Sequence, residues 1–315
     1  MKKTIAALLL LAAAYAQAQE KVTFMPQWTA QAQFAGYYVA QEKGFYADAG
    51  LEVTIQHVST STSKSSLEHV LDGSVDICTG QLIQGMIYRD KGKDLINVLQ
   101  TSQNCSLMCV ANRPFTSLSD MDGMRIARWK AGFGETADLF CQEYGFKNIE
   151  WIYFASGINL FVSKAVDATL CYCYSEYLDL LFARGEIPAG NVLEFGKLGF
   201  NFPEDAIMTT DRYYNGHRDS VEKFKEASIR GWDYAREHPE ETLDIVMDYV
   251  RRNNITTNRF HQKMMLDKVL GLQVNPDSGQ ADFSHMDKEM FQNLNEEMKG
   301  IGFISNYVNF SDFLK

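Results

Sequence analysis

A run of aromatic residues around one carboxylate is the first place in this sequence where residue types indicate chemistry. Tyr172, Tyr174 and Glu176 belong to the segment YCYSEY, which directly follows a predicted strand at 168–172. In open α/β sheets, ligands bind at the carboxyl ends of strands, so we expect these side chains to face a cleft. A carboxylate there can accept hydrogen bonds from an exocyclic amine and a ring nitrogen, whereas it would repel a sulphonate or nitrate. The alternative is that Glu176 only begins the next helix, since acidic residues favour first turns.

Trp28 is a second candidate for contact with a flat molecule. It lies in a predicted loop at 25–32, beside Pro26 and Gln27. An indole ring offers a flat, rigid face, and aromatic pairs contribute about 0.5–1.5 kcal/mol beyond the burial of their area. The loop position favours a ligand contact, because binding residues are concentrated on loops. The alternative is that Trp28 belongs to the core.

Uncharged hydrogen-bonding side chains occur on predicted loops and helix starts, and they suit a neutral heterocycle better than a strong anion. They are Gln81, Gln84, Gln103 and Asn104. The turn at 132–135, GFGE, presents backbone N–H groups at a helix start, which can bind an anion or a carbonyl group. Phe133 and Glu135 are therefore candidates as well, although this short glycine pattern is equally typical of a plain turn.

The sequence contains no recognisable catalytic or metal-binding motif. G-x-S-x-G, H-E-x-x-H and P-loop patterns are missing, and the six histidines show no metal-ligand spacing. The six cysteines permit disulfides in an oxidising compartment without requiring them, and buried small hydrophobic residues are the simpler interpretation. We therefore expect no catalytic residue, no metal and no cofactor.

The candidate residues must be positioned by an alternation of strands and helices. Strands are predicted at 21–24, 51–55, 75–78, 96–99 and 107–111, with helices at 34–44, 65–71 and 81–89 between them. The pattern repeats with strands at 125–127, 150–154 and 168–172 and helices at 132–144 and 158–162. Such alternation predicts an α/β fold in which each lobe is a mainly parallel sheet flanked by helices.

The same pattern predicts two lobes joined by a hinge of two strands. A strand at 205–210 returns to the first lobe, and amphipathic helices at 220–237 and 239–250 then cover that lobe. The expected division is 19–110 and 208–315 for lobe 1 and 111–207 for lobe 2, with crossings near residues 110 and 206. Two crossings allow the lobes to close around a ligand between them.

Length and charge agree with two lobes and exclude a nucleic-acid partner. The chain has 315 residues, above the roughly 250–300 at which single cores stop growing. Apolar residues make up 46 % of the sequence, which is enough for two cores. The formal net charge of −10 opposes binding to a phosphate backbone.

The first eighteen residues are typical of a cleavable secretory signal peptide. Lys2 and Lys3 precede an apolar run at 5–15, and Ala-Gln-Ala at 16–18 is a cleavage signal. The apolar run is shorter than the roughly 20 residues that span a bilayer. We therefore expect export of the mature chain to a bacterial periplasm.

Several segments resemble one family of solute-binding proteins. The most informative is QFAGYYVA at 33–40, which follows QWT at 27–29 and precedes KGFY at 43–46 and GLEV at 50–53. Further matches are LDGSVD at 71–76, SKAVDA at 163–168, VEKF at 221–224, GWDYA at 231–235 and HPEE at 238–241. These segments resemble the family that binds thiamine-pyrimidine precursors, aliphatic sulphonates or nitrate, and Gln33 and Phe34 complete the candidate ligand-binding residues.

The resemblance implies a periplasmic binding protein of the second structural type that works as a monomer with the membrane permease and ATPase subunits of an ABC importer. The Trp28 loop resembles the pyrimidine branch most, in which a tryptophan stacks on the ring. A sulphonate, a taurine-like molecule or another small organic solute is the alternative. Eukaryotic pyrimidine synthases of this fold use a lysine and a histidine of their own chain, but the matching positions here are Gly80 and Gln84. The resemblance therefore implies binding rather than catalysis.

Overall fold

The structure is a computed structural model that describes residues 19–59, 64–130, 133–155 and 157–315. The predicted signal peptide at 1–18 lies outside the described residues.

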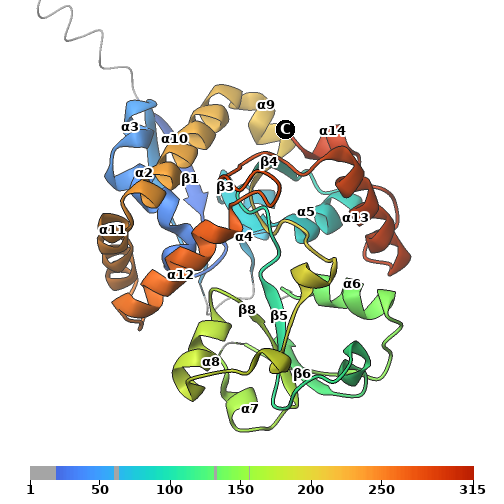
Figure 1. Cartoon of the computed structure of the whole chain (residues 1–315). Helices are drawn as coiled ribbons and strands as arrows, with labels where there is room; N and C mark the ends of the chain where they lie inside the picture. Colours follow the sequence, from blue (N-terminus) through green and yellow to red (C-terminus); the bar gives the residue numbers. More distant parts are fainter. Residues whose placement is uncertain (1–18, 60–63, 131–132, 156) are drawn as a thin grey trace, which may run out of the picture.

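The chain forms two lobes, each built on a five-stranded sheet with helices packed on its faces (Figure 1). The first sheet has the order β2-β1-β3-β10-β4, formed by Leu51–Ile55, Glu20–Met25, Ile77–Gln81, Asp205–Thr209 and Ile96–Gln100. The second has the order β7-β6-β8-β5-β9, formed by Glu150–Phe154, Arg125–Trp129, Ala168–Tyr172, Leu107–Ala111 and Val192–Glu194. The predicted two-lobe α/β architecture is confirmed.

Most helices belong to the first lobe, and the predicted helical C-terminal third covers it (Figure 1). In this lobe they are α2 Ala35–Glu42, α3 Phe45–Asp48, α4 Ser66–Leu71, α5 Leu82–Asp90, α9 Asp211–Gly216, α10 Arg218–Glu237, α11 Pro239–Arg252, α12 Arg259–Leu272, α13 Lys288–Gly300 and α14 Phe310–Phe313. In the second lobe they are α6 Glu135–Glu143, α7 Asn159–Val162 and α8 Glu176–Arg184. Short 3-10 helices are Ala32–Phe34, Leu118–Met121, Ala189–Asn191 and Phe195–Leu198.

One strand in each sheet runs against the other four, and it is the strand that follows a crossing between the lobes. In the first sheet β10 is antiparallel to β3 and β4, and in the second sheet β5 is antiparallel to β8 and β9. Both sheets are therefore mixed but mainly parallel. Because β5 lies wholly in the second sheet and β10 wholly in the first, the chain crosses before Leu107 and before Asp205, a few residues earlier than predicted. A sequence pattern identifies a strand but not the sheet in which it pairs.

Two element boundaries near the candidate site also differ from the prediction. The strand predicted at 75–78 is β3, Ile77–Gln81, so Gln81 ends a strand instead of beginning a helix. The helix predicted at 132–144 is α6, which begins at Glu135. Strand β3 is buried along its whole length, so it has no alternation of polar and apolar residues to mark its ends.

Lobe 1 depends on a close approach between α2 and α10. A Cβ atom at Gly231 would lie 2.0 Å from the carbonyl oxygen of Gly36, and one at Gly36 would lie 2.2 Å from the ring of Trp232. The indole of Trp232 is 2 % exposed and packs edge-on against Tyr37, with ring centroids 5.6 Å apart. Gly36 and Gly231 therefore allow the backbones of α2 and α10 to come into direct contact beside the Trp232 ring.

We expect Gly231→Ala to lower the free energy of unfolding by about 1–3 kcal/mol, because the added methyl group has to push two backbones apart. Gly271→Ala in α12 is the matched control, since nothing lies within 4 Å of its Cβ position. Urea unfolding of the two variants measures the difference. Equal stability of both variants would contradict the proposed helix contact.

Candidate functional site

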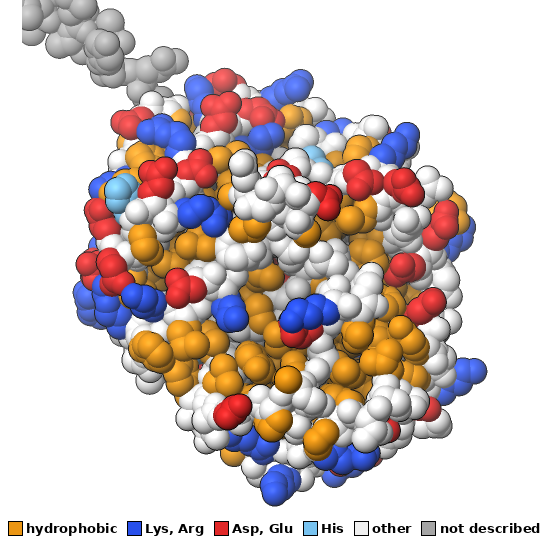
Figure 2. Space-filling model, viewed as in Figure 1, with side chains coloured by type: hydrophobic (Ala, Val, Ile, Leu, Met, Phe, Trp, Pro, Cys, Tyr) orange, Lys and Arg blue, Asp and Glu red, His pale blue; other side chains and the backbone are white. Residues whose placement is uncertain are grey.

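A slot between the two lobes brings together residues from the carboxyl ends of both sheets. Including solvent at its mouth, it holds about 370 Å³. It is lined by Gln27, Trp28, Gln31, Gln33, Gln81, Trp129, Phe133, Tyr172, Tyr174, Ser175 and Glu176. On the face seen in Figure 2, hydrophobic side chains are frequent around the junction of the lobes, with some charged side chains among them near the middle. The lining of the slot itself is mostly uncharged, and it lies where the fold concentrates strand ends.

Two groups of aromatic rings form the aromatic wall of the slot. Trp129, at the end of β6, stacks on Tyr172 at 5.0 Å between ring centroids, and Tyr172 stacks on Tyr174 at 5.5 Å. Trp28, from the loop after β1, meets Phe133 of the other lobe edge-to-face at 5.9 Å. Trp28 is half-buried. It lines the slot, as a ligand contact would, and it also packs against the core, as the alternative interpretation expected. Such a wall can accept the face of a planar ring.

Two hydrogen bonds join the lobes inside the slot. Gln81 Nε2 donates to Tyr172 Oη at 2.7 Å, and Gln33 Nε2 donates to Tyr174 Oη at 3.1 Å. Burial raises the pKa of both phenols well above the usual value, so both remain neutral at physiological pH. These two bonds connect the lobes across the slot, and neither of them involves a charged group.

Glu176 is the one acidic residue in the described lining. Its carboxylate accepts hydrogen bonds from Trp129 Nε1 at 3.2 Å and from the backbone N–H of Tyr172 at 3.3 Å. Burial raises the pKa of Glu176 to about 7, although these bonds oppose the shift. It is also the first residue of α8, so it both begins the helix and lines the slot. Near neutral pH this carboxyl can gain or lose a proton when a ligand binds.

The other predicted site residues lie outside the slot. Gln84 Nε2 donates to Glu135 Oε1 at 3.3 Å, a contact between lobes. Phe34 is buried in lobe 1 and lines a smaller enclosed cavity behind the slot. Gln103 donates to the backbone carbonyls of Asp282 and Ser284. Asn104 donates to the carbonyls of Leu272 and Val274. Gly132 lies outside the described residues.

Sequence reasoning missed three important residues of the slot: Gln27, Gln31 and Trp129. Trp129 ends β6, so the rule that ligands bind at the carboxyl ends of strands would have selected it. Gln27 and Gln31 flank Trp28 in the same loop, and the loop itself was the available signal. All three could have been predicted by extending to them the arguments already used for Tyr172 and Trp28.

Within the described ranges, no group of three or more His, Cys, Asp or Glu side chains could hold a metal ion. Five of the cysteines are buried and Cys105 is partly exposed, and all six carry free thiols. No helix in the part of the chain that the structure describes combines the length and apolar character needed to cross a membrane.

A family model described as NMT1/THI5 like matches residues 31–242, which is more than half of the chain and includes most of the slot. The chain belongs to the NMT1/THI5-like family. The matched region includes the Trp129–Tyr172–Tyr174 stack, the two interlobe hydrogen bonds and Glu176, whereas Gln27 and Trp28 lie just before it.

Known relatives of this NMT1/THI5-like protein are named as binding proteins. The riboflavin-binding protein RibY of Chloroflexus aurantiacus is 23 % identical over 91 % of this chain and 82 % of its own. A formylaminopyrimidine-binding protein of Halalkalibacterium halodurans is 21 % identical over 73 % of this chain and 71 % of its own. The periplasmic aliphatic sulphonate binding protein SsuA of Escherichia coli superposes with a TM-score of 0.65 at 15 % identity, covering 93 % of this chain and 91 % of that one. The fold is thus that of periplasmic binding proteins, as the resemblance implied.

The raised pKa of Glu176 predicts that the contribution of this residue to the free energy of unfolding falls as the pH rises. The unfolded carboxyl loses its proton near its ordinary pKa of 4.5, while the folded one keeps it to about 7. The contribution of Glu176 to stability is therefore complete below pH 4.5 and is lost as the pH rises through about 7. Urea unfolding at pH 5 and pH 8 should show a smaller decline in Glu176→Gln than in the wild type, by roughly 2–3 kcal/mol.

Glu204, whose pKa burial also raises to about 7, is present in both proteins, so its effect cancels in this comparison. Identical pH dependence of the two proteins would contradict a buried, neutral Glu176.

Proposed function

We propose that this protein is the substrate-binding protein of an ABC importer and captures a small flat heterocycle, an aminopyrimidine, in the slot between its lobes. The observation that carries the proposal is the combination in one slot of an aromatic wall with the carboxyl of Glu176. The wall offers a stacking surface, and the carboxyl offers a partner for an amine and a ring nitrogen.

The charge of the slot supports a neutral ligand over an anionic one. Its described lining contains no Lys, Arg or His, and its titratable groups are Glu176 and two tyrosines. A sulphonate would have no cation to pair with and would meet a carboxyl that is partly ionised near pH 7. The names of the two sequence relatives, which bind a flavin and a pyrimidine, support the same class of planar, nitrogen-containing ring.

The slot is narrow, since its cavity volume of about 40 Å³ is well below the roughly 300–1,000 Å³ that is usual for ligand sites, so the lobes would have to part to admit a ring. The two crossings between the sheets form the hinge about which lobe 2 would close on such a molecule. The predicted signal peptide supports a periplasmic location. As part of an ABC importer, the protein would act as a monomer and deliver its ligand to permease and ATPase subunits in the membrane.

Binding is favoured over synthase chemistry by the residues at the positions used in the eukaryotic pyrimidine synthases. The lysine that holds pyridoxal phosphate there is Gly80 in this chain, and a Cβ at this position would lie 2.5 Å from Cδ2 of Leu67. A lysine at this position would therefore have to displace the Leu67 side chain. The histidine position is Gln84, which bonds to Glu135 across the lobes. The residues present do not suit that cofactor.

We expect Trp28→Ala to weaken aminopyrimidine binding about tenfold or more, because a stacking face is lost. Its melting temperature should change little, since Trp28 is a half-buried loop residue. Trp151→Ala is the matched control: this indole lies in lobe 2, outside the slot, with the Arg128 guanidinium 4.6 Å from its ring centroid. Isothermal titration and thermal unfolding measure both effects. A large loss of stability with unchanged affinity would show that Trp28 is a core residue and not a ligand contact.

Glu176→Gln should weaken aminopyrimidine binding and leave binding of an alkanesulphonate unharmed. An amide replaces one oxygen acceptor with a donor and removes the charge that strengthens the bond. Titration of wild type and variant with an aminopyrimidine, riboflavin and an alkanesulphonate tests this. If the wild type bound the sulphonate and gave no heat with the pyrimidine, the ligand assignment would be wrong, and the binding-protein proposal would remain.

A further inference from the structure

Asp205 joins the hinge of the protein through its backbone. It is the first residue of β10, immediately after the chain returns from lobe 2. Its carbonyl oxygen accepts hydrogen bonds from the N–H of Thr101 at 2.8 Å, from Thr101 Oγ1 at 3.0 Å and from Gln100 Nε2 at 2.7 Å. Its own N–H donates to Ser102 Oγ at 2.8 Å. The two crossing segments are therefore fastened to each other at this residue.

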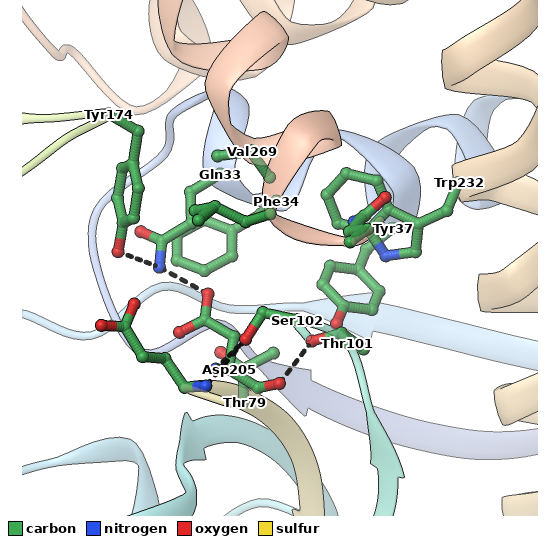
Figure 3. Close-up of a pocket in the computed structure, with 13 residues that line it drawn as sticks. Gln33, Phe34, Tyr37, Thr79, Thr101, Ser102, Tyr174, Asp205, Trp232 and Val269 are labelled. Atoms are coloured by element: carbon green, nitrogen blue, oxygen red, sulfur yellow. Dashed lines mark hydrogen bonds between the residues drawn. The ribbon is translucent and has the colours of Figure 1, made fainter. Parts of the chain in front are cut away.

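The side chain of Asp205 extends toward the slot, where it holds two glutamines. Oδ1 accepts from Gln27 Nε2 and Oδ2 accepts from Gln33 Nε2, each at 2.8 Å. Figure 3 shows Gln33 between Asp205 and Tyr174, bonded to both. Burial raises the pKa of Asp205, and the two amide donors oppose that shift.

This arrangement decides which end of each amide faces the carboxylate. Both carboxyl oxygens of Asp205 accept hydrogen bonds, so the NH₂ groups of Gln27 and Gln33 point at Asp205, and their oxygens point elsewhere. The oxygen of Gln33 is occupied, because it accepts from Gln31 Nε2 at 2.7 Å. The oxygen of Gln27 is buried and has no hydrogen-bond partner among the described residues, although Gln27 lines the slot.

We propose that Gln27 Oε1 is the acceptor in lobe 1 for an N–H donor on the ligand, and that Asp205 is the positioning residue that keeps this oxygen, and not the amide nitrogen, available to it. The proposal rests on the proposed function and deepens it. A buried acceptor without a partner destabilises the empty protein, so a donor that reaches it gains more than an exposed hydrogen bond would provide. A ligand with a carbonyl at that edge meets oxygen against oxygen and is rejected.

The matching acceptor in lobe 2 is Glu176. Gln27 and Glu176 lie in the same slot but on opposite lobes, so a ligand with donors at two of its edges can be held by both. Such a ligand connects the lobes, whereas a ligand with one donor is held by one lobe only. The hinge residue thus contributes to selectivity, although it does not itself line the slot.

Asp205→Asn tests the positioning role. Asparagine presents one NH₂ group where the carboxylate had an oxygen, so one glutamine must turn its amide around. Gln33 is held in place by Tyr174 and Gln31, while the oxygen of Gln27 has no bond to lose. Gln27 should therefore turn and present its NH₂ group to the slot. The ratio of affinities for 4-aminopyrimidine over 4-pyrimidinone, measured by isothermal titration, should fall roughly tenfold or more.

Two further variants complete the experiment. Glu204→Gln alters the neighbouring buried carboxylate, which bonds to Ser106 and not to the glutamines, and it should leave the affinity ratio unchanged. Gln27→Met removes the acceptor without supplying a donor, so it should weaken the binding of 4-aminopyrimidine more than the binding of 4-pyrimidinone. This variant tests the proposal if Asp205→Asn does not fold.

The outcomes separate this inference from the function on which it rests. Wild-type protein that binds neither pyrimidine contradicts the proposed function, and the inference with it. Wild-type protein that prefers 4-aminopyrimidine, together with an unchanged ratio in the folded Asp205→Asn or Gln27→Met variants, overturns the role of Gln27 and Asp205 alone. A ratio that falls in these variants and not in Glu204→Gln supports it.

Discussion

Each sheet of this protein is completed by a strand that enters directly from the other lobe, and this constraint on the chain path organises everything else. β5 enters the second sheet and β10 enters the first, each antiparallel to its neighbours. Both begin at the junction of the lobes, where the parallel strands end. The carboxyl ends of the two sheets therefore face each other, and their loops form the slot. The hinge and the site occupy one region because the same strands create both.

The chemistry of the slot follows from its lack of fixed charge. Its polar groups are mainly amides and phenols that bond to each other across the lobes, as in the pairs Gln81–Tyr172 and Gln33–Tyr174. Desolvation is inexpensive for such groups when they are paired, whereas an unpaired charge there would cost much more. Glu176 meets the same environment by holding its proton up to about pH 7. These surroundings are the reason for proposing a planar, uncharged ring with hydrogen-bonding edges as the ligand.

The lobes also meet away from the slot, between α8 and α12. His261 Nε2 lies 3.1 Å from Asp179 Oδ1, and Phe182 packs against Phe260 with ring centroids 5.8 Å apart. Phe182 and Phe260 are 46 % and 61 % exposed, so this contact lies at the surface. A partly exposed aromatic pair and one close His–Asp contact contribute modestly, and they can separate without opening either core. Contacts of this kind are compatible with the proposed closure of the lobes around a ligand.

The sequence by itself determined the order of elements, the two lobes and the aromatic run that contains Tyr172, Tyr174 and Glu176, because alternation and strand ends are local properties of the chain. It also indicated Trp28, Gln33, Gln81 and Phe133, which the structure brings into one slot. Gln84 and Glu135 meet each other instead, and Gln103 bonds to carbonyls near residue 283. Only the tertiary structure decided these outcomes, since a glutamine's partner depends on which atoms the fold places beside it. The roles of Gln27 and Asp205 depend on a contact over 178 positions of sequence, and no local pattern encodes it.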